Sequence, residues 1–176
     1  MADTTGPRRR GNPSGIRRAR PDEAAALSEL ALRSKAMWGY PPEFVEACRP
    51  ALTVTPDEIR DAPFYVHEDG AGVSGFYGLG GHAPRATLEY LFVDPRATRR
   101  GIGTKLLRHA IATACRAGFG ELEVESDPNA EAFYRRNGAT RVGEAESTVQ
   151  PGRFLPLLVM DLALPAEAAR PNSGPG

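Results

Sequence analysis

Two arginines and two glycines stand close together directly before a segment of helical periodicity. Gly101 and Gly103 lack a Cβ atom, so the backbone there can turn tightly and approach a ligand closely. The start of a helix carries unpaired N–H groups and the positive end of the helix dipole, and together these bind phosphate oxygens. Arg99 and Arg100 add positive charge, and Thr104 adds a hydroxyl. The sequence therefore predicts an anion site at this turn.

The glycine pattern argues against two common nucleotide sites. The P-loop pattern GxxxxGK[ST] is absent. The dinucleotide fingerprint GxGxxG is broken, because Leu106 stands where its third glycine belongs. A turn that binds nothing stays open as the alternative, since glycine also serves turns for purely conformational reasons.

A second group of polar and aromatic residues follows the alternating segment 121–125. The run Asp127-Pro128-Asn129 is typical of a helix start, and the short helix it predicts carries Phe133 and Tyr134 and ends at Gly138. Aromatic residues on short helices usually pack in a core. A phenol can also donate a proton, because its reference pKa is about 10.

The elements around these two groups predict an α/β fold. Strands are expected at 16–20, 64–66, 73–79, 88–93, 121–125, 141–144 and 154–162, and helices are expected to begin near 21, 41, 55, 102 and 129. The short links between the second, third and fourth strands favour antiparallel pairing, whereas the strand–helix–strand crossover that follows favours parallel pairing. The result is a mixed (α+β), mainly antiparallel central sheet of about six to seven strands with helices on both faces.

Length and charge limit the function classes. The 176 residues suit one domain, expected at 15–163, and the Pro- and Gly-rich segments 1–14 and 164–176 are expected to be disordered tails. The 22 basic and 22 acidic side chains cancel, so no overall charge favours nucleic acid. No apolar run reaches the roughly 18 residues of a membrane span, and no signal-peptide pattern is present, so we expect a cytoplasmic protein.

The histidines and cysteines do not predict a metal site. Cys48 and Cys115 are too few for a disulfide framework and are expected to be reduced thiols. His67, His82 and His109 show no ligand spacing, so surface positions are expected for all three.

Two runs together resemble one known family. The run 88–95 followed by Arg99-Arg100-Gly101-Ile102-Gly103-Thr104 resembles the acetyl-CoA motif of the GNAT N-acetyltransferase superfamily, and the run 127–139 resembles its later motif. The order and spacing of the two motifs agree with that superfamily, and its order of elements fits residues 16–162. One position departs from the pattern, because Thr98 stands where Gln or Arg is usual, and Arg99 or Arg100 would compensate.

The resemblance implies direct transfer of an acetyl group from acetyl-CoA to an amine, without a covalent enzyme intermediate. Backbone N–H groups at the end of the strand 88–93 would polarise the thioester carbonyl, Asn129 would hold the pantetheine arm, and Tyr134 would protonate the departing thiolate. The cofactor-binding residues implied are Leu91, Phe92, Val93, Arg99, Arg100, Gly101, Ile102, Gly103, Thr104, Asn129 and Phe133.

Two carboxylates are candidates for the base that takes a proton from the amine. Glu89 is preferred, because strand alternation would place it on the same face as Leu91 and Val93. Glu125, on the neighbouring parallel strand, is the second candidate. For each, the alternative is a carboxylate that only attracts a cationic acceptor.

The early part of the chain bears on the acceptor. In this superfamily the early helices and their loop help to wall the acceptor pocket, which points to Trp38, Tyr40 and Phe44, with Glu125 as a further binding candidate. A small-molecule amine is the preferred acceptor. The alternatives are a protein amine, from lysine or the N-terminus, and a catalytically silent acyl-CoA-binding domain. No metal, nucleic-acid or membrane partner is expected, and a homodimer is the working hypothesis for the assembly.

Overall fold

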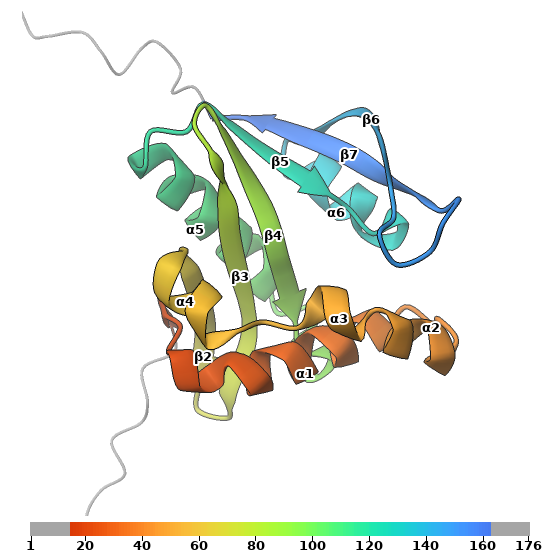
Figure 1. The fold of residues 1–176 in the computed structure, drawn as a ribbon. Coiled ribbons are helices and arrows are strands. Elements are labelled where there is room, and N and C mark those ends of the chain that lie inside the picture. The colour runs from red at the N-terminus through yellow and green to blue at the C-terminus, as the bar shows by residue number, and fades with distance from the viewer. Residues whose placement is uncertain (1–14, 163–176) are drawn as a thin grey trace, which may run out of the picture.

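One seven-stranded sheet organises the computed structural model, which describes residues 15–162. The predicted tails 1–14 and 164–176 lie outside the described residues. The strand order is β1-β2-β3-β4-β5-β7-β6, and of these neighbours β4 and β5 alone pair in parallel (Figure 1). The predicted mixed, mainly antiparallel fold is confirmed. The strands are β1 (Gly15–Arg18), β2 (Phe64–Asp69), β3 (Gly72–His82), β4 (Arg85–Val93), β5 (Glu121–Glu125), β6 (Thr140–Glu146) and β7 (Phe154–Asp161).

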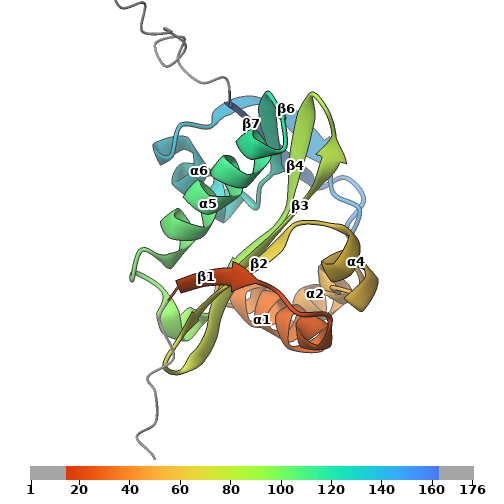
Figure 2. The same cartoon turned by 90° about the vertical axis from the view of Figure 1, so that its left-hand side faces the viewer.

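Helices cover both faces of the sheet, as Figure 2 shows. One face carries α1 (Ala24–Ala36), which packs against the short helices α2 (Pro42–Ala47), α3 (Arg49–Leu52) and α4 (Pro56–Asp61). The other carries α5 (Ile102–Arg116) and α6 (Glu131–Arg136). Each face therefore has its own apolar core. Short 3-10 turns at Pro21–Glu23, Pro95–Ala97 and Pro128–Ala130 precede α1, α5 and α6.

The long helix α5 is held to the sheet by one apolar stripe. The buried side chains on this helix recur at the spacing of one helical face, and they are Ile102, Leu106, Leu107, Ala110 and Ala114. They lie against β3 and β4. Because this stripe is buried along the length of α5, the first turn of the helix has a fixed place relative to the end of β4. The unpaired N–H groups of the predicted anion site lie in that first turn.

Strands β4 and β5 pair over only a short stretch and then separate. The parallel ladder consists of Arg85↔Glu121, Ala86↔Leu122 and Thr87↔Glu123, so the rest of β4 has no partner on this side. A β-bulge interrupts the other ladder of β4, between Gly78 and Leu79 of β3. A bulge bends and twists its strand, which accounts for the divergence. Figure 1 shows the two strands splaying towards their C-terminal ends.

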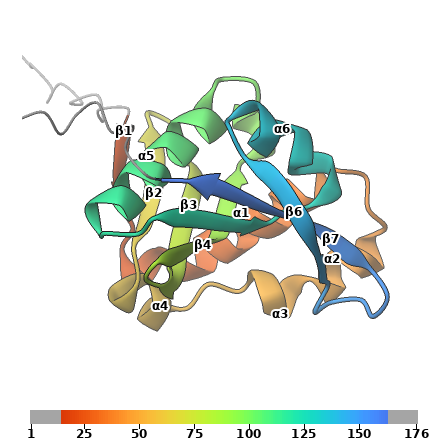
Figure 3. The same cartoon turned by 90° about the horizontal axis from the view of Figure 1, so that it is seen from above.

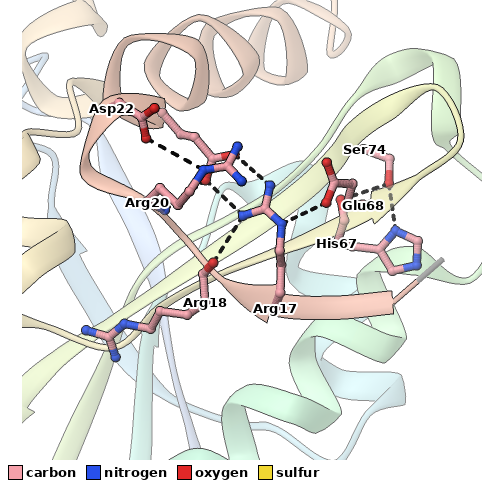
Figure 4. A network of polar contacts seen from close by, with 8 residues as sticks. Arg17, Arg18, Arg20, Asp22, His67, Glu68 and Ser74 are labelled. Atoms are coloured by element: carbon pink, nitrogen blue, oxygen red, sulfur yellow. Dashed lines mark hydrogen bonds and ion pairs between the residues drawn. The ribbon is translucent and has the colours of Figure 1, made fainter. Parts of the chain in front are cut away.

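Arginine side chains fasten β1 to the edge of the sheet (Figure 4). Arg17 pairs with Glu68 of β2 at 2.7 Å and with Glu23 at 2.7 Å. The hydrogen bond from Arg17 holds the pKa of Glu23 below its usual range. A four-residue strand offers few ladder bonds, so these pairs connect it both to β2 and to the turn that starts α1.

Two histidines lie deeper than their expected surface positions. His67 is 4% exposed, and its Nδ1 lies 2.7 Å from the Ser74 hydroxyl. His109 is half-buried, with Nδ1 2.7 Å from the hydroxyl of Tyr77. Burial lowers the pKa of both imidazoles. The prediction was wrong for these two because each ring finds a hydroxyl partner on a strand, which ligand spacing does not reveal.

Candidate functional site

The glycine turn before α5 has the geometry of an anion site. Gly101 has a φ of 73° and nothing within 4 Å of the position a Cβ would occupy, so backbone conformation rather than space favours glycine there. Arg99 also adopts a positive φ, 62°. The first bond of the helix runs from Lys105 N to Gly101 O at 3.1 Å. The N–H groups of Ile102, Gly103 and Thr104 therefore have no intrahelical acceptor.

This turn lies beside two other predicted groups. A Cβ built on Gly103 would come 3.5 Å from the Phe133 ring and 3.7 Å from the Val93 side chain. The start of α5, the end of β4 and the middle of α6 thus meet at one place. Three of the residues implied to bind the cofactor come together here.

The side chains of the turn differ in what they contact. Arg100 Nη1 lies 3.2 Å from Asp69 Oδ2, which accepts no hydrogen bond from residues 15–162. Arg99 is exposed, and no ion pair forms on it within the described part of the chain. Thr98, at the position that departs from the family pattern, donates its hydroxyl to Pro95 O at 3.0 Å. Thr98 therefore stabilises the turn that precedes Gly101.

The bulge in β4 changes the face on which Glu89 lies. Leu88 packs in the core under α5, whereas Tyr90, two residues later, packs in the core under α1. In a regular strand the two would share a face, and the bulge adds Glu89 between them on the α1 side. A Cβ on Gly80 would lie 2.1 Å from Glu89 Oε1, which places the carboxylate over that glycine. Glu89 thus does not share the face of Leu91, and that prediction was wrong.

Glu89 is nevertheless close to the splay between β4 and β5. Partial desolvation, with a smaller contribution from the charge of Glu58, raises the pKa of its carboxyl, and the residue as a whole is exposed. Farther along the strand, Leu91 and Val93 pack towards α5, while Phe92 packs towards α1. The main chain from Glu89 to Val93 borders the splay because β5 pairs only with Arg85 to Thr87.

Tyr134 projects from α6 into the core beneath α5. It is 6% exposed, and its ring meets Phe133 edge-on with centroids 5.1 Å apart. Burial, and to a lesser extent the charge of Asp127, raises the pKa of its hydroxyl. The phenol therefore stays protonated at neutral pH.

A polar network joins three segments far apart in the chain. Asp127 accepts hydrogen bonds from Lys35 Nζ at 2.5 Å, from the Tyr40 hydroxyl at 3.0 Å and from the backbone N–H of Asn129 at 2.9 Å. Arg153 Nη2 donates to the Tyr40 hydroxyl at 2.8 Å, and Asn129 Nδ2 donates to it at 3.0 Å. We call these five residues the Asp127 network.

Most of this network is absent from the sequence-based prediction. The run at Asp127 correctly indicated a helix start, and Tyr40 and Asn129 were predicted for other roles. Lys35 and Arg153 were missed as site residues. Their partners lie 92 and 113 residues away, and no local spacing records such pairs.

A hollow of about 390 Å³ opens beside the Asp127 network, and it is lined by Tyr40, Pro41, Glu43, Phe44, Gln150 and Arg153. Figure 3 shows α2 and the start of β7 on the same side of the molecule. Trp38 and Glu125 are exposed and do not line this hollow. A second hollow, between α1 and the α3–α4 segment, contains none of the predicted site residues.

The part of the chain that the structure describes was also searched for metal sites, disulfides and membrane-spanning helices. No group of three or more His, Cys, Asp or Glu side chains there could hold a metal ion. Cys48 and Cys115 are free thiols. Among residues 15–162, no helix has both the length and the apolar character needed to cross a membrane.

Comparisons with known proteins bear on this geometry. Residues 60–138 match the family model of the GNAT acetyltransferase domain. That stretch contains β4, the glycine turn, α5 and α6. No curated protein sequence matches the chain.

Solved structures share the fold. The PaiA N-acetyltransferase of Thermoplasma acidophilum, solved with coenzyme A, is 21% identical, with a TM-score of 0.71 over 85% of this chain and 99% of that one. An N-acetyltransferase of Staphylococcus aureus Mu50 is 22% identical, with a TM-score of 0.62 over 86% and 100%. The ribosomal-protein-S18-alanine N-acetyltransferase of Escherichia coli is 17% identical, with a TM-score of 0.64 over 90% and 99%.

The family match therefore covers both motifs of the candidate site, and the fold is shared over nearly the whole length of these structures. Residues 60–138 thus match a GNAT acetyltransferase domain, and the chain shares the fold of solved N-acetyltransferases.

Proposed function

We propose that this protein transfers an acetyl group from acetyl-CoA to the amine of a small molecule. The observation that carries the proposal is the splay between β4 and β5, which has the free N–H groups of α5 at one end and buried Tyr134 beside it. The hollow of about 390 Å³ beside the Asp127 network supports a small acceptor, because its volume is that of a site for a small ligand.

The turn would hold the pyrophosphate of acetyl-CoA. Backbone N–H groups of Ile102 to Thr104 face no acceptor within the helix, and Arg99 and Arg100 supply positive charge at the rim. In the splay, N–H groups of Leu91 to Val93 would polarise the thioester carbonyl. Asn129 uses its Nδ2 within the Asp127 network, which leaves Oδ1 to accept a hydrogen bond from the pantetheine arm.

Transfer then needs two proton movements. The neutral amine attacks the thioester carbonyl carbon, so a C–N bond forms and the C–S bond breaks. Tyr134 donates its hydroxyl proton to the leaving sulfur as the C–S bond breaks, and the raised pKa of its phenol keeps that proton in place at neutral pH. Glu89, directly or through a water, takes the proton that the amine nitrogen loses. Its raised pKa makes it a stronger base than an ordinary carboxylate. Glu125 remains the second candidate for this role.

Release of free thiol tests the proposal. We expect purified protein to release coenzyme A from acetyl-CoA in the presence of small amines and to do so more slowly with peptides that carry a free N-terminus or lysine. Faster turnover of the peptides would favour the protein-acceptor alternative. If acetyl-CoA neither raises the melting temperature nor reacts with any amine, the proposal is wrong.

A pair of glycine variants tests the anion site separately. Gly101 and Gly118 lie at opposite ends of α5, have φ values of 73° and 85°, and have open space at the Cβ position. Gly101→Val and Gly118→Val should thus suffer similar backbone strain, on the order of 1–2 kcal/mol. Only Gly101→Val distorts the N–H groups at the helix start.

We expect the Kd for acetyl-CoA, measured by calorimetry, to rise about tenfold or more in Gly101→Val, because that corresponds to about 1.4 kcal/mol. Gly118→Val should bind acetyl-CoA like the wild type. Equal losses of affinity in both variants would mean that the effect comes from general destabilisation of α5.

A further inference from the structure

Arg153 stands against the aromatic wall of the hollow beside the Asp127 network. Its guanidinium carbon lies 4.7 Å from the centroid of the Phe44 ring and 5.1 Å from that of Tyr40. The side chain is 18% exposed. Packing on two rings and the bond to the Tyr40 hydroxyl fix the plane of the guanidinium at the surface of the hollow.

The positive charge of Arg153 is not matched by a carboxylate in direct contact. Its nearest carboxylate oxygen, Asp127 Oδ2, lies 3.8 Å away, and that oxygen already receives Lys35 at 2.5 Å. Of the five N–H donors of a guanidinium, one makes a hydrogen bond within residues 15–162, to Tyr40. Glu43 lines the same hollow but forms no ion pair with any described residue.

Arg153 supplies the positive charge of the hollow's lining, and Glu43 supplies its negative charge. Lys35 and Asp127 pair with each other outside this lining, so the guanidinium of Arg153 is the group there that can bind an anion. The faces of Tyr40 and Phe44 are covered by these cations, at 4.7–5.7 Å, so the rings do not offer a place for a cationic group. A planar guanidinium with free parallel N–H groups matches a carboxylate through two hydrogen bonds.

We propose that the acceptor carries a carboxylate in addition to its amine, and that Arg153 binds this carboxylate in the hollow lined by Tyr40, Phe44 and Gln150. This inference rests on the proposed function, in which the bound molecule accepts the acetyl group on its amine. The acceptors it predicts are small amino acids and related amino-carboxylic acids.

Paired acceptors test the inference. Each common amino acid is compared with its carboxamide, which has the same amine but no negative charge, and kcat/KM is measured by thiol release. We expect the wild type to prefer the best carboxylates about 10- to 100-fold, which is the size of a charge-assisted hydrogen bond. Arg153→Gln should remove this preference, mainly through KM, and Arg153→Lys should keep part of it because the charge remains.

Arg136→Gln is the matched control, because Arg136 is exposed on α6 and lies outside the hollow. It should keep the full preference. Melting temperatures of all three variants check that each is folded. Equal use of carboxylates and carboxamides by the wild type would overturn the inference, as would an Arg153→Gln variant that retains the preference.

A binding experiment separates this inference from the proposed function. N-acetyl amino acids and their carboxamides are titrated into the protein by calorimetry, without turnover. Binding of the carboxylates that depends on Arg153 supports the carboxylate site even if no amine is acetylated. Absence of such binding, together with no discrimination among acceptors, would refute the site.

Discussion

Replacing Tyr134 with phenylalanine is expected to lower kcat by roughly 100-fold or more, which is the usual contribution of a general acid. The variant loses only the hydroxyl, and its ring keeps the contacts with Phe133 and the core under α5. Because the ring contacts are kept, we expect little change in the free energy of unfolding. Binding of acetyl-CoA should also remain near the wild-type value. The measurement is steady-state kinetics with calorimetric binding of acetyl-CoA.

Tyr77→Phe is the control for loss of a buried phenol hydroxyl. Tyr77 is fully buried in the same core, but its hydroxyl lies 2.7 Å from His109 and 3.0 Å from Thr113. We expect this variant to lose about 1 kcal/mol of stability through the lost hydrogen bonds and to keep its kcat. Full turnover in Tyr134→Phe would instead show that the thiolate takes its proton from water or another group.

The pH dependence of the activity shows whether the Tyr134 hydroxyl titrates in the neutral range or stays protonated. Burial raises the pKa of Tyr134, so the hydroxyl keeps its proton throughout the neutral range. Loss of activity at mildly alkaline pH would therefore have to come from another group. At acid pH the activity should fall as Glu89 takes up a proton, and this loss begins above the ordinary range of a glutamate because the pKa of Glu89 is raised.

The local structure around the candidate site that the sequence predicted correctly depends on neighbouring residues. The glycine turn places unpaired N–H groups through two residues and the helix that follows them. Asp127 begins the turn before α6 through a bond to the N–H of Asn129, two residues on. The apolar stripe of α5 follows a helical period and predicted the buried face. Each of these features depends on residues within a few positions of one another.

The features that were missed depend on pairing between distant segments. Residues 88–93 alternate as an ordinary strand would, and the bulge that turns Glu89 to the other face arises only in the ladder with β3. A lysine at the end of a helix is usually exposed to solvent, whereas the side chain of Lys35 is 13% exposed and pairs with Asp127. Register and long-range ion pairs are properties of the folded chain, and hydrophobic periodicity does not specify them.

Removing the Asp127 carboxylate is expected to cause the largest loss of stability among the variants considered. Asp127→Ala leaves Lys35 without its partner and takes the acceptor from the Tyr40 hydroxyl. Breaking a buried ion pair on one side typically costs 3–5 kcal/mol, and we expect about 3 kcal/mol because both side chains keep some contact with water. Chemical denaturation at pH 7 measures the change in the free energy of unfolding.

Asp57→Ala serves as the control, because Asp57 pairs with Arg60 on the surface and is 76% exposed. Its cost should stay below about 1 kcal/mol. The double variant Asp127→Leu with Lys35→Met should be more stable than Asp127→Ala, since it leaves no unpaired ammonium group. Additive losses in the double variant would contradict a direct interaction between the two side chains.

The pH dependence supplies a second test of the same carboxylate. Hydrogen bonds from Lys35, Asn129 and Tyr40 outweigh the opposing effect of burial and lower the pKa of Asp127 below its ordinary value of 3.8. A depressed pKa means that the folded state binds the proton less readily than the unfolded state. The stability that Asp127 contributes is therefore complete above about pH 5 and is lost as the pH falls below 3.8 towards the folded-state pKa. The wild type and Asp127→Asn should thus differ fully at pH 7 and converge in acid, and a difference that does not depend on pH would show that packing, rather than charge, stabilises this part of the site.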